Sequence, residues 1–287
     1  MLRNLRDLHD YAIGATDGDI GHVKDFYFDD QAWVIRYLVV ETGQWLSSRK
    51  VLISPIAFGH LDLQEKILPV SITREQVKNS PDIDTDKPVS RQYESQYHGY
   101  YAYAPYWGET GLWGPNFLMP EFMATPSDAQ RQPDSASVDA SVARHRGEDS
   151  HLRSCKVVMG YHIHASDGEI GRVHGMLVDE KTWAIRFVIV NTSNWWIGHQ
   201  VLISPEWIDD ISWADGTVSL NVTRHKFRDA PPYDESILVD RMHEISVYKH
   251  YEDMGYWVKE QIPDALRGSF PTRDANERNR TEQSGLG

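Results

Sequence analysis

The chain has 287 residues, of which 42 are acidic and 29 basic, and its formal net charge at pH 7 is −13. Binding to nucleic-acid phosphates or to anionic lipid headgroups needs a clustered excess of Lys and Arg, so this balance argues against both kinds of partner. A single cysteine, Cys155, excludes an intramolecular disulfide and a zinc site built from several cysteines.

The N-terminal residues contain no apolar run of signal-peptide length, and no window approaches the roughly 20 apolar residues of a membrane helix. We therefore expect a cytoplasmic protein without an integral membrane segment.

The first 84 residues predict a series of short strands separated by turns. Asp17-Gly18 lies between two apolar runs, and Asp-Gly is a strong signal for a two-residue hairpin turn. The following strand changes the parity of its apolar positions between Val23 and Phe26, which predicts a β-bulge near Asp25. Further strands are expected at 33–40, 50–54 and 67–72, and a short helical turn is expected after Arg74.

The same pattern recurs 150 residues later without a gap. Tyr11 to Val23 aligns with Tyr161 to Val173, and Val51 to Pro55 aligns with Val201 to Pro205. This period is too long for a solenoid, so the pattern indicates a duplicated domain. The expected organisation is a β-barrel over 1–84, an aromatic-rich tail over 85–124, a flexible linker over 125–150, a second β-barrel over 151–234, its tail over 235–257 and a disordered C-terminus over 258–287.

Many short strands without a long amphipathic helix indicate an all-β fold of two small barrels. The Asp-Gly-x-Ile-Gly-x-Val run beginning at Asp17, and the Val-Leu-Ile-Ser-Pro strand beginning at Val51, resemble the PRC-barrel domain, as do their counterparts at Asp167 and Val201. That domain is named for the cytoplasmic part of the photosynthetic reaction-centre H subunit, and it also forms the C-terminal half of RimM-type ribosome-maturation factors. The resemblance implies a binding or assembly module without established catalysis.

Several residues are candidates for a ligand site. His162 and His164 share one face of a strand and could chelate a metal with His174, although exposed strand histidines are the simpler interpretation. Asp82, Asp84 and Asp86 begin like a calcium loop but lack its glycine and its final glutamate, so a solvated turn is expected.

Two further kinds of residue have structural interpretations. Cys155 aligns with Leu5 and is expected to be a core residue rather than a nucleophile. Arg36 and Arg186 each interrupt an apolar strand. They could bind anions, but pairing with neighbouring carboxylates such as Asp29 and Asp179 is preferred.

Aromatic residues gather after each predicted barrel. The chain has 10 Trp and 14 Tyr, and the stretch 97–107 has its counterpart in Tyr248 to Trp257. Packing of these tails on a barrel is favoured over an external partner. The aromatic residues chosen as candidate partner-binding residues are Trp45, Trp195, Trp196, Tyr101, Tyr106 and Trp107.

No acid–base pair or nucleophile motif is found, so the first hypothesis is a non-enzymatic protein-interaction or assembly module that uses no cofactor. Its partner is expected to be a protein, with intramolecular packing of the two barrels or a homodimer. The alternatives are a small-ligand or metal-binding sensor that uses the second hairpin, or a soluble factor resembling the H subunit in photosynthetic electron transport.

Overall fold

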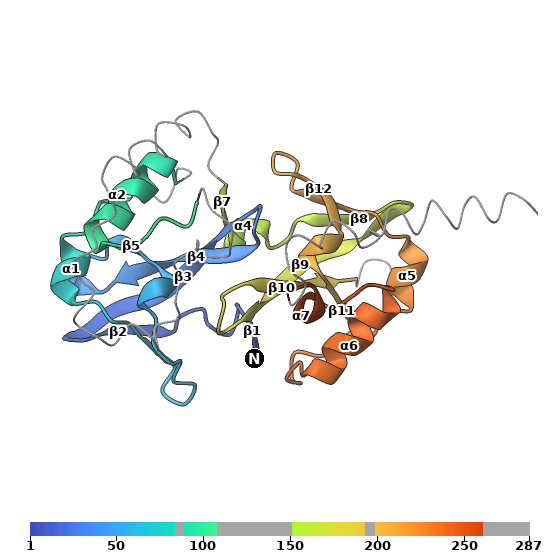
Figure 1. Ribbon diagram of the computed structural model, residues 1–287, viewed down its shortest axis with the longest axis horizontal. Coiled ribbons are helices and arrows are strands. Elements are labelled where there is room, and N and C mark those ends of the chain that lie inside the picture. The colour runs from blue at the N-terminus through green and yellow to red at the C-terminus, as the bar shows by residue number, and fades with distance from the viewer. Residues whose placement is uncertain (84–88, 108–150, 193–198, 261–287) are drawn as a thin grey trace, which may run out of the picture.

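The computed structural model describes residues 1–83, 89–107, 151–192 and 199–260. Strands predominate in this part of the chain, and they form two sheets that lie next to each other (Figure 1). The predicted linker, the end of the first aromatic tail and residues 261–287 lie outside the described residues.

The two sheets share an order of five strands, and the second sheet has one further strand at each edge. In the first sheet the order is β5-β4-β3-β2-β6, and in the second, read in the same direction, it is β14-β11-β10-β9-β8-β13-β12. The strands of the first sheet are β2 (Ala12–Ala15), β3 (Gly18–Asp29), β4 (Val34–Thr42), β5 (Lys50–Ile53) and β6 (Ile67–Pro69). Those of the second are β8 (His162–Ala165), β9 (Gly168–Asp179), β10 (Ile185–Asn191), β11 (Gln200–Ile203), β12 (Ile208–Ser212), β13 (Thr217–Leu220) and β14 (Pro232–Tyr233).

The predicted Asp-Gly hairpins are present in both sheets. Gly18 and Gly168 have φ angles of 135° and 137°, a region that glycine enters without steric cost. The carboxylate of Asp17 accepts a hydrogen bond from the backbone N–H of Arg74 at 2.7 Å, and Asp167 does the same for Arg224. Each turn is thereby tied to the short helix that follows the sheet, namely α1 (Arg74–Lys78) or α5 (Arg224–Arg228).

The predicted β-bulge is confirmed in both sheets. The register of β3 against β4 shifts between Val23 and Asp25, and that of β9 against β10 shifts opposite Val173 and Gly175. The extra residue restores the inward direction of the apolar side chains that follow it.

Two short strands are exchanged between the sheets. β1 (Leu2–Asn4) pairs with β9, and β7 (Leu152–Ser154) pairs with β3. The expected domain boundaries assigned each of these segments to the sheet that follows it in sequence. The structure instead places each on the other sheet, because a strand of three residues is positioned by its pairing partner rather than by its own pattern.

The sheets also meet directly at the beginnings of β4 and β10. Val34 and Ala184 form an antiparallel bridge, the N–H of Ile35 donates to the carbonyl of Trp183 at 2.9 Å, and the N–H of Ile185 donates to the carbonyl of Trp33 at 2.7 Å. These two hydrogen bonds are equivalent under the 150-residue repeat, so the junction has approximate two-fold symmetry.

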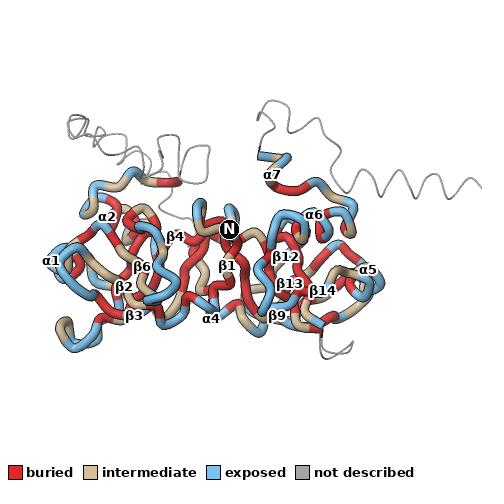
Figure 2. Tube along the Cα trace, turned by 90° about the horizontal axis from the view of Figure 1, so that it is seen from below, coloured by how far each residue is buried: buried red, intermediate tan, exposed pale blue. Residues whose placement is uncertain are grey.

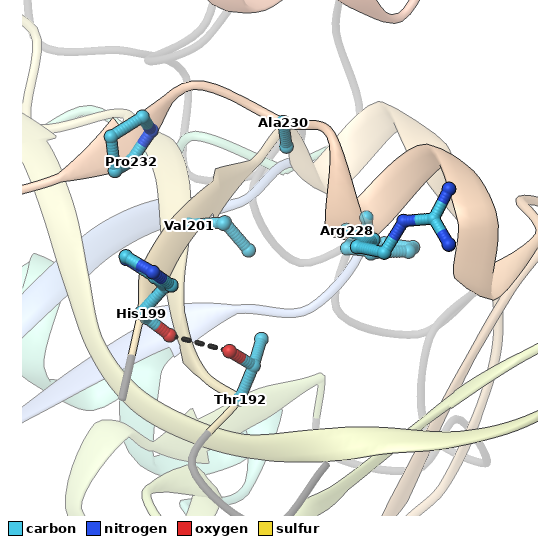
Figure 3. A pocket seen from close by; sticks show the side chains of 7 residues that line it. Thr192, His199, Val201, Arg228, Ala230 and Pro232 are labelled. Atoms are coloured by element: carbon cyan, nitrogen blue, oxygen red, sulfur yellow. Dashed lines mark hydrogen bonds between the residues drawn. The ribbon is translucent and has the colours of Figure 1, made fainter. Parts of the chain in front are cut away.

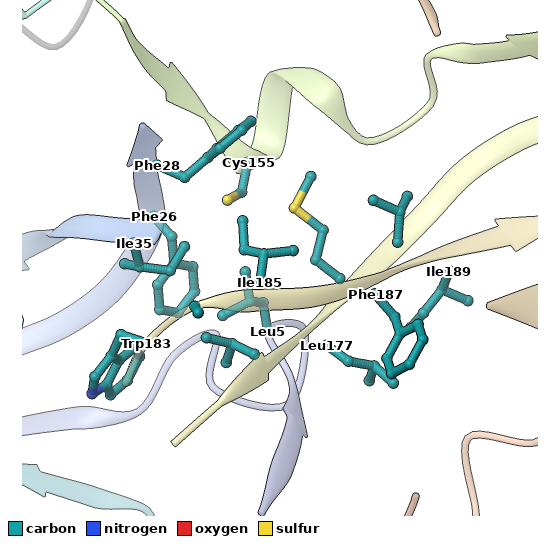
Figure 4. Packing of buried hydrophobic residues seen from close by; sticks show 14 of the residues in the cluster. Leu5, Phe26, Phe28, Ile35, Cys155, Leu177, Trp183, Ile185, Phe187 and Ile189 are labelled. Carbon is teal, nitrogen blue, oxygen red and sulfur yellow. The ribbon is translucent and has the colours of Figure 1, made fainter. Parts of the chain in front are cut away.

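A single apolar core runs through this junction. Figure 4 shows Leu5, Phe26, Ile35, Cys155, Ile185 and Phe187 in this core, to which both halves of the chain contribute, and Figure 2 shows buried chain at the centre of the molecule. Cys155 is fully buried at the start of α4 (Cys155–Val158), as expected for a core residue, and burial raises the pKa of its thiol.

Helices cover the outer face of each sheet. α2 (Arg91–Tyr101) lies on the first sheet, where Tyr97 packs with Tyr37, Val39 and Leu52. The corresponding helix on the second sheet is α6 (Arg241–His250), followed by α7 (Tyr256–Lys259). Short 3₁₀ turns occur at η1 (Gln44–Leu46), η2 (Pro55–Ala57) and η4 (Pro205–Trp207).

The first aromatic tail contains α2, whose tyrosines are held in place by contact with the sheet. The disordered terminus was expected to begin at residue 258, yet α7 extends to Lys259. The packing of the tail on a sheet was expected.

Gly21 allows a close approach between β3 and β4. A Cβ atom at this position would lie 2.0 Å from the carbonyl oxygen of Glu41, whereas a Cβ atom on Gly99 in α2 would meet no neighbouring atom within 4 Å. Gly21→Ala should therefore lower the free energy of unfolding by about 3 kcal/mol or more through displacement of the strand. Gly99→Ala is the matched control and should raise it by up to about 1 kcal/mol, because alanine is the better helix former.

Urea denaturation of both variants measures these effects. A Gly21→Ala protein as stable as the wild type would contradict the strand approach described for β3 and β4.

Candidate functional site

The three histidines do not converge on one point. His162 Nδ1 lies 2.7 Å from Glu169 Oε1, while His174 Nε2 lies 2.9 Å from Glu235 Oε1 and also contacts Arg6. His164 is half-buried on β8. Among the residues that the structure describes, no three His, Cys, Asp or Glu side chains are placed to share a metal ion.

The acidic turn falls partly outside the described residues, which include Asp82 but neither Asp84 nor Asp86. Asp82 is exposed and pairs with Arg49 Nε at 2.7 Å. This arrangement agrees with a solvated turn.

Trp45 is held by its own sheet rather than projecting freely. Its Nε1 donates to the carbonyl of Ile20 at 2.7 Å, and the guanidinium of Arg74 lies 4.3 Å from the ring centroid. Trp45 stays partly exposed, with its indole N–H anchored on β3. Trp195 and Trp196 lie outside the described residues.

The three candidate aromatics of the first tail face inward. Tyr106 and Trp107 are buried, and Tyr101 is half-buried with its ring 4.8 Å from that of Tyr97. Tyr106 and Trp107 therefore offer little surface to a partner, whereas Tyr101 remains partly exposed. The apolar area of these rings stabilises the tail.

Tyr106 and Trp107 belong to a buried charged cluster under α2. Arg36 pairs with Asp29 at 3.3 Å, as preferred from the sequence, and its guanidinium lies 3.8 Å from the Tyr106 ring centroid. Arg91 pairs with Glu94 at 2.9 Å and lies over the Trp107 ring at 4.8 Å. The hydroxyl of Tyr106 donates to Glu94.

The second sheet repeats this cluster. Arg241 pairs with Glu244 at 3.3 Å and lies over the ring of Trp257 at 4.2 Å, while Arg186 lies over the ring of Tyr256 at 3.9 Å. Arg186 differs from Arg36 in its ion pair, which is with Glu260 at 2.7 Å. The repeated members are Arg36, Arg91, Glu94, Tyr106 and Trp107, with counterparts Arg186, Arg241, Glu244, Tyr256 and Trp257.

Sequence reasoning missed two members of each cluster. Arg91 and Glu94, and their counterparts Arg241 and Glu244, were not singled out, although the 150-residue offset that aligns the two sheets also aligns them. Their spacing of three residues on a helix places both side chains on one face. The identity of charged residues at the 150-residue offset, beyond the strands of each half, was the signal that could have found them.

The first cluster contains two groups that the second lacks. Tyr37 and His98 occupy the positions of Phe187 and Tyr248. His98 Nδ1 donates to the carbonyl of Ala104 at 3.0 Å, which leaves Nε2 as an acceptor for the Tyr37 hydroxyl at 3.0 Å. That hydroxyl also lies 3.2 Å from Glu94 Oε1, but it has one hydrogen to donate.

A protonated Glu94 resolves this competition, because its own hydroxyl can then donate to the oxygen of Tyr37. Burial raises the pKa of Glu94 to about 7, against the lowering effect of Arg91. Burial also lowers the pKa of His98 to about 4, which favours the neutral imidazole. The first cluster therefore contains a carboxyl group and an imidazole whose usual order of pKa values is inverted.

A surface feature distinguishes α6 from its counterpart α2. Leu238, Met242 and Ile245 are 56, 71 and 41% exposed. Leu238 lies two residues before the N-cap Asp240, and Met242 and Ile245 share one face of α6 because they are three residues apart. We call these three residues the α6 patch. The corresponding residues of the first half are Pro88, Gln92 and Ser95.

Figure 3 shows a small pocket of about 200 Å³ beside β11. Thr192 uses its hydroxyl to donate to the carbonyl of His199 at 2.6 Å, and Val201, Ala230 and Pro232 contribute apolar wall. The pocket brings together no acid–base pair or anion-binding group beyond His199 and Arg228, so we assign no site to it.

The inverted pKa values predict an unusual pH dependence of stability. Because folding raises the pKa of Glu94, its folded form binds the extra proton between about pH 4.5 and 7, so this group favours folding at low pH and loses that contribution as the pH rises. The free energy of unfolding of the wild type minus that of Glu94→Gln should fall on the order of 3 kcal/mol across this range. Folding lowers the pKa of His98, so this residue contributes stability that increases as the pH rises from about 4 to 6.5. The free energy of unfolding of the wild type minus that of His98→Tyr should therefore rise over this range.

Urea denaturation at half-unit pH steps gives both differences, and Glu75→Gln, which changes an exposed carboxylate, is the control. A wild-type minus Glu94→Gln difference that stays constant, or that rises with pH, would show that Glu94 is ionised in the folded protein throughout.

Part of the chain is similar to known proteins. Residues 5–77 match the PRC-barrel domain. An uncharacterised protein of Deinococcus radiodurans is 32% identical over 114 residues, which cover 33% of this chain and 41% of that protein. The match therefore spans less than half the length of that relative. None of the helices in the described ranges has the length and apolar character to cross a membrane. The matched residues 5–77 contain the strands β2 to β6 and all of α1 except its last residue.

Proposed function

We propose that the protein is a non-enzymatic assembly module in which the PRC-barrel domain and a second copy of it, over residues 155–227, form one rigid platform. The recurrence of the strands, bulge, capping aspartate and charged cluster at an offset of 150 residues supports the second copy. The continuous core and the exchanged strands support the rigid platform.

The α6 patch carries the proposal of an assembly role. Large apolar side chains on an exposed helix are typical of interaction surfaces when they form one contiguous patch. The equivalent face of α2 carries Gln92 and Ser95, so the fold itself does not require Met242 and Ile245 to be apolar.

We propose that a second copy of the chain covers this patch, with the two α6 helices antiparallel. Asp240 is exposed at the N-terminal end of α6 and Lys249 near its C-terminal end. An antiparallel pair brings Asp240 of one helix close to Lys249 of the other across a two-fold axis and also opposes the helix dipoles.

The double variant Met242→Gln/Ile245→Ser should convert a dimer to a monomer. Removing two apolar side chains from the centre of the interface should weaken dimerisation at least tenfold, because burial of each contributes about 1.5–3 kcal/mol. Sedimentation equilibrium over a range of protein concentrations measures this change, and circular dichroism checks that the fold is retained. Gln92→Ser, at the equivalent place on α2, is the matched control and should leave the dimer intact.

A wild-type protein that is monomeric at all concentrations would contradict the second copy as occupant, and so would equal dimerisation of the double variant. In the first case, a different protein bound at the α6 patch would overturn self-association but retain the assembly role.

A further inference from the structure

A cavity of about 360 Å³ lies at the junction of the two sheets. This volume falls in the range of small-molecule sites. Its walls combine aromatic, aliphatic and polar side chains from both halves of the chain, among them Trp33, Arg186, Ser204, Ile208, Tyr248 and Tyr256.

The cavity corresponds to a place that is filled by side chains in the other half of the repeat. There, Phe58 packs edge-on against Trp183 with ring centroids 4.8 Å apart. Under the 150-residue offset, Trp183 corresponds to Trp33 and Phe58 corresponds to Ile208. Because Ile208 has no aromatic ring, the place that Phe58 fills beside Trp183 is left open beside Trp33.

Arg186 gives this cavity a polar wall of defined charge. Its side chain is only 10% exposed, and its Nε has no hydrogen-bond partner among the residues that the structure describes. Its ion pair is with Glu260, whose own side chain is 49% exposed. The carboxylate that lines the cavity, Glu206, pairs with Lys259 at 2.7 Å.

A nearly buried guanidinium whose ion-pair partner is half-exposed can exchange that partner for a carboxylate that enters the cavity. Guanidinium groups bind carboxylates through charge-assisted hydrogen bonds, often two at once. Tyr256 already lies under the guanidinium at 3.9 Å, so it fixes the plane in which those donors point. Trp33, Ile208 and Tyr248 offer apolar and aromatic surface to the rest of such a molecule.

We propose that this junction cavity binds a small aromatic carboxylate, with the carboxylate on Arg186 in place of Glu260 and the ring in the space beside Trp33. The site is independent of the α6 patch, so it does not depend on the proposed assembly role. It would couple a small acid to the interface between the two halves, since Trp33 comes from the first half and Arg186 from the second.

Titration calorimetry with 2-naphthoate tests this site, and 2-naphthamide serves as the uncharged probe of the same shape. We expect saturable binding of one 2-naphthoate per chain, at least tenfold tighter than binding of 2-naphthamide. Ile208→Phe, which restores the residue type of the other half, should fill the cavity and weaken binding at least tenfold. Phe58→Ile removes a ring at the equivalent place outside the cavity and should change the affinity less than twofold.

Absence of saturable 2-naphthoate binding would overturn the proposal, as would unchanged binding by Ile208→Phe. Equal affinity for the two probes would overturn the carboxylate class. Arg186→Gln adds a second check, with a thermal melt to verify folding, because its loss of selectivity for 2-naphthoate over 2-naphthamide does not depend on filling the cavity.

Discussion

The contact between the beginnings of β4 and β10 is the interaction on which the rest of the structure depends. Two backbone hydrogen bonds, from Ile35 to Trp183 and from Ile185 to Trp33, join the sheets at the point where their apolar faces meet. The exchanged strands β1 and β7 reinforce this junction, because each extends the sheet of the other half. A small β domain buries a modest core alone, and the shared core enlarges it.

The outer faces of the sheets are covered by helices that carry buried ion pairs. α2 and α6 each bring an arginine and a glutamate onto the sheet, where the glutamate is buried and paired and the arginine lies over an aromatic ring. Isolated buried charges would be strongly destabilising, so the pairing and the aromatic contacts must be retained together. Residues that differ between the two halves include Tyr37 and His98 in the first cluster, those of the α6 patch, and Ile208 at the junction cavity.

The members of the two charged clusters could have been identified from the internal repeat, but their arrangement in space could not. The offset that aligns Trp33 with Trp183 also aligns Glu94 with Glu244, so the clusters could have been found by following charged identities past the predicted barrels. The exposure of Tyr106 and Trp107 could not be predicted, because an aromatic tail has the same composition whether it covers its own sheet or a partner. Met242 and Ile245 are exposed, and the sequence analysis did not single them out.

By itself the sequence determined the local elements: the Asp-Gly turns, the bulge near Asp25, the strands and the burial of Cys155. These depend on residues close together in the chain, namely on turn conformation and on the parity of apolar positions. Tertiary structure alone decided which sheet Leu2–Asn4 and Leu152–Ser154 join, where α2 packs, and how Trp33 and Arg186 come to line one cavity. Those outcomes depend on contacts between residues far apart in the chain, which local patterns do not specify.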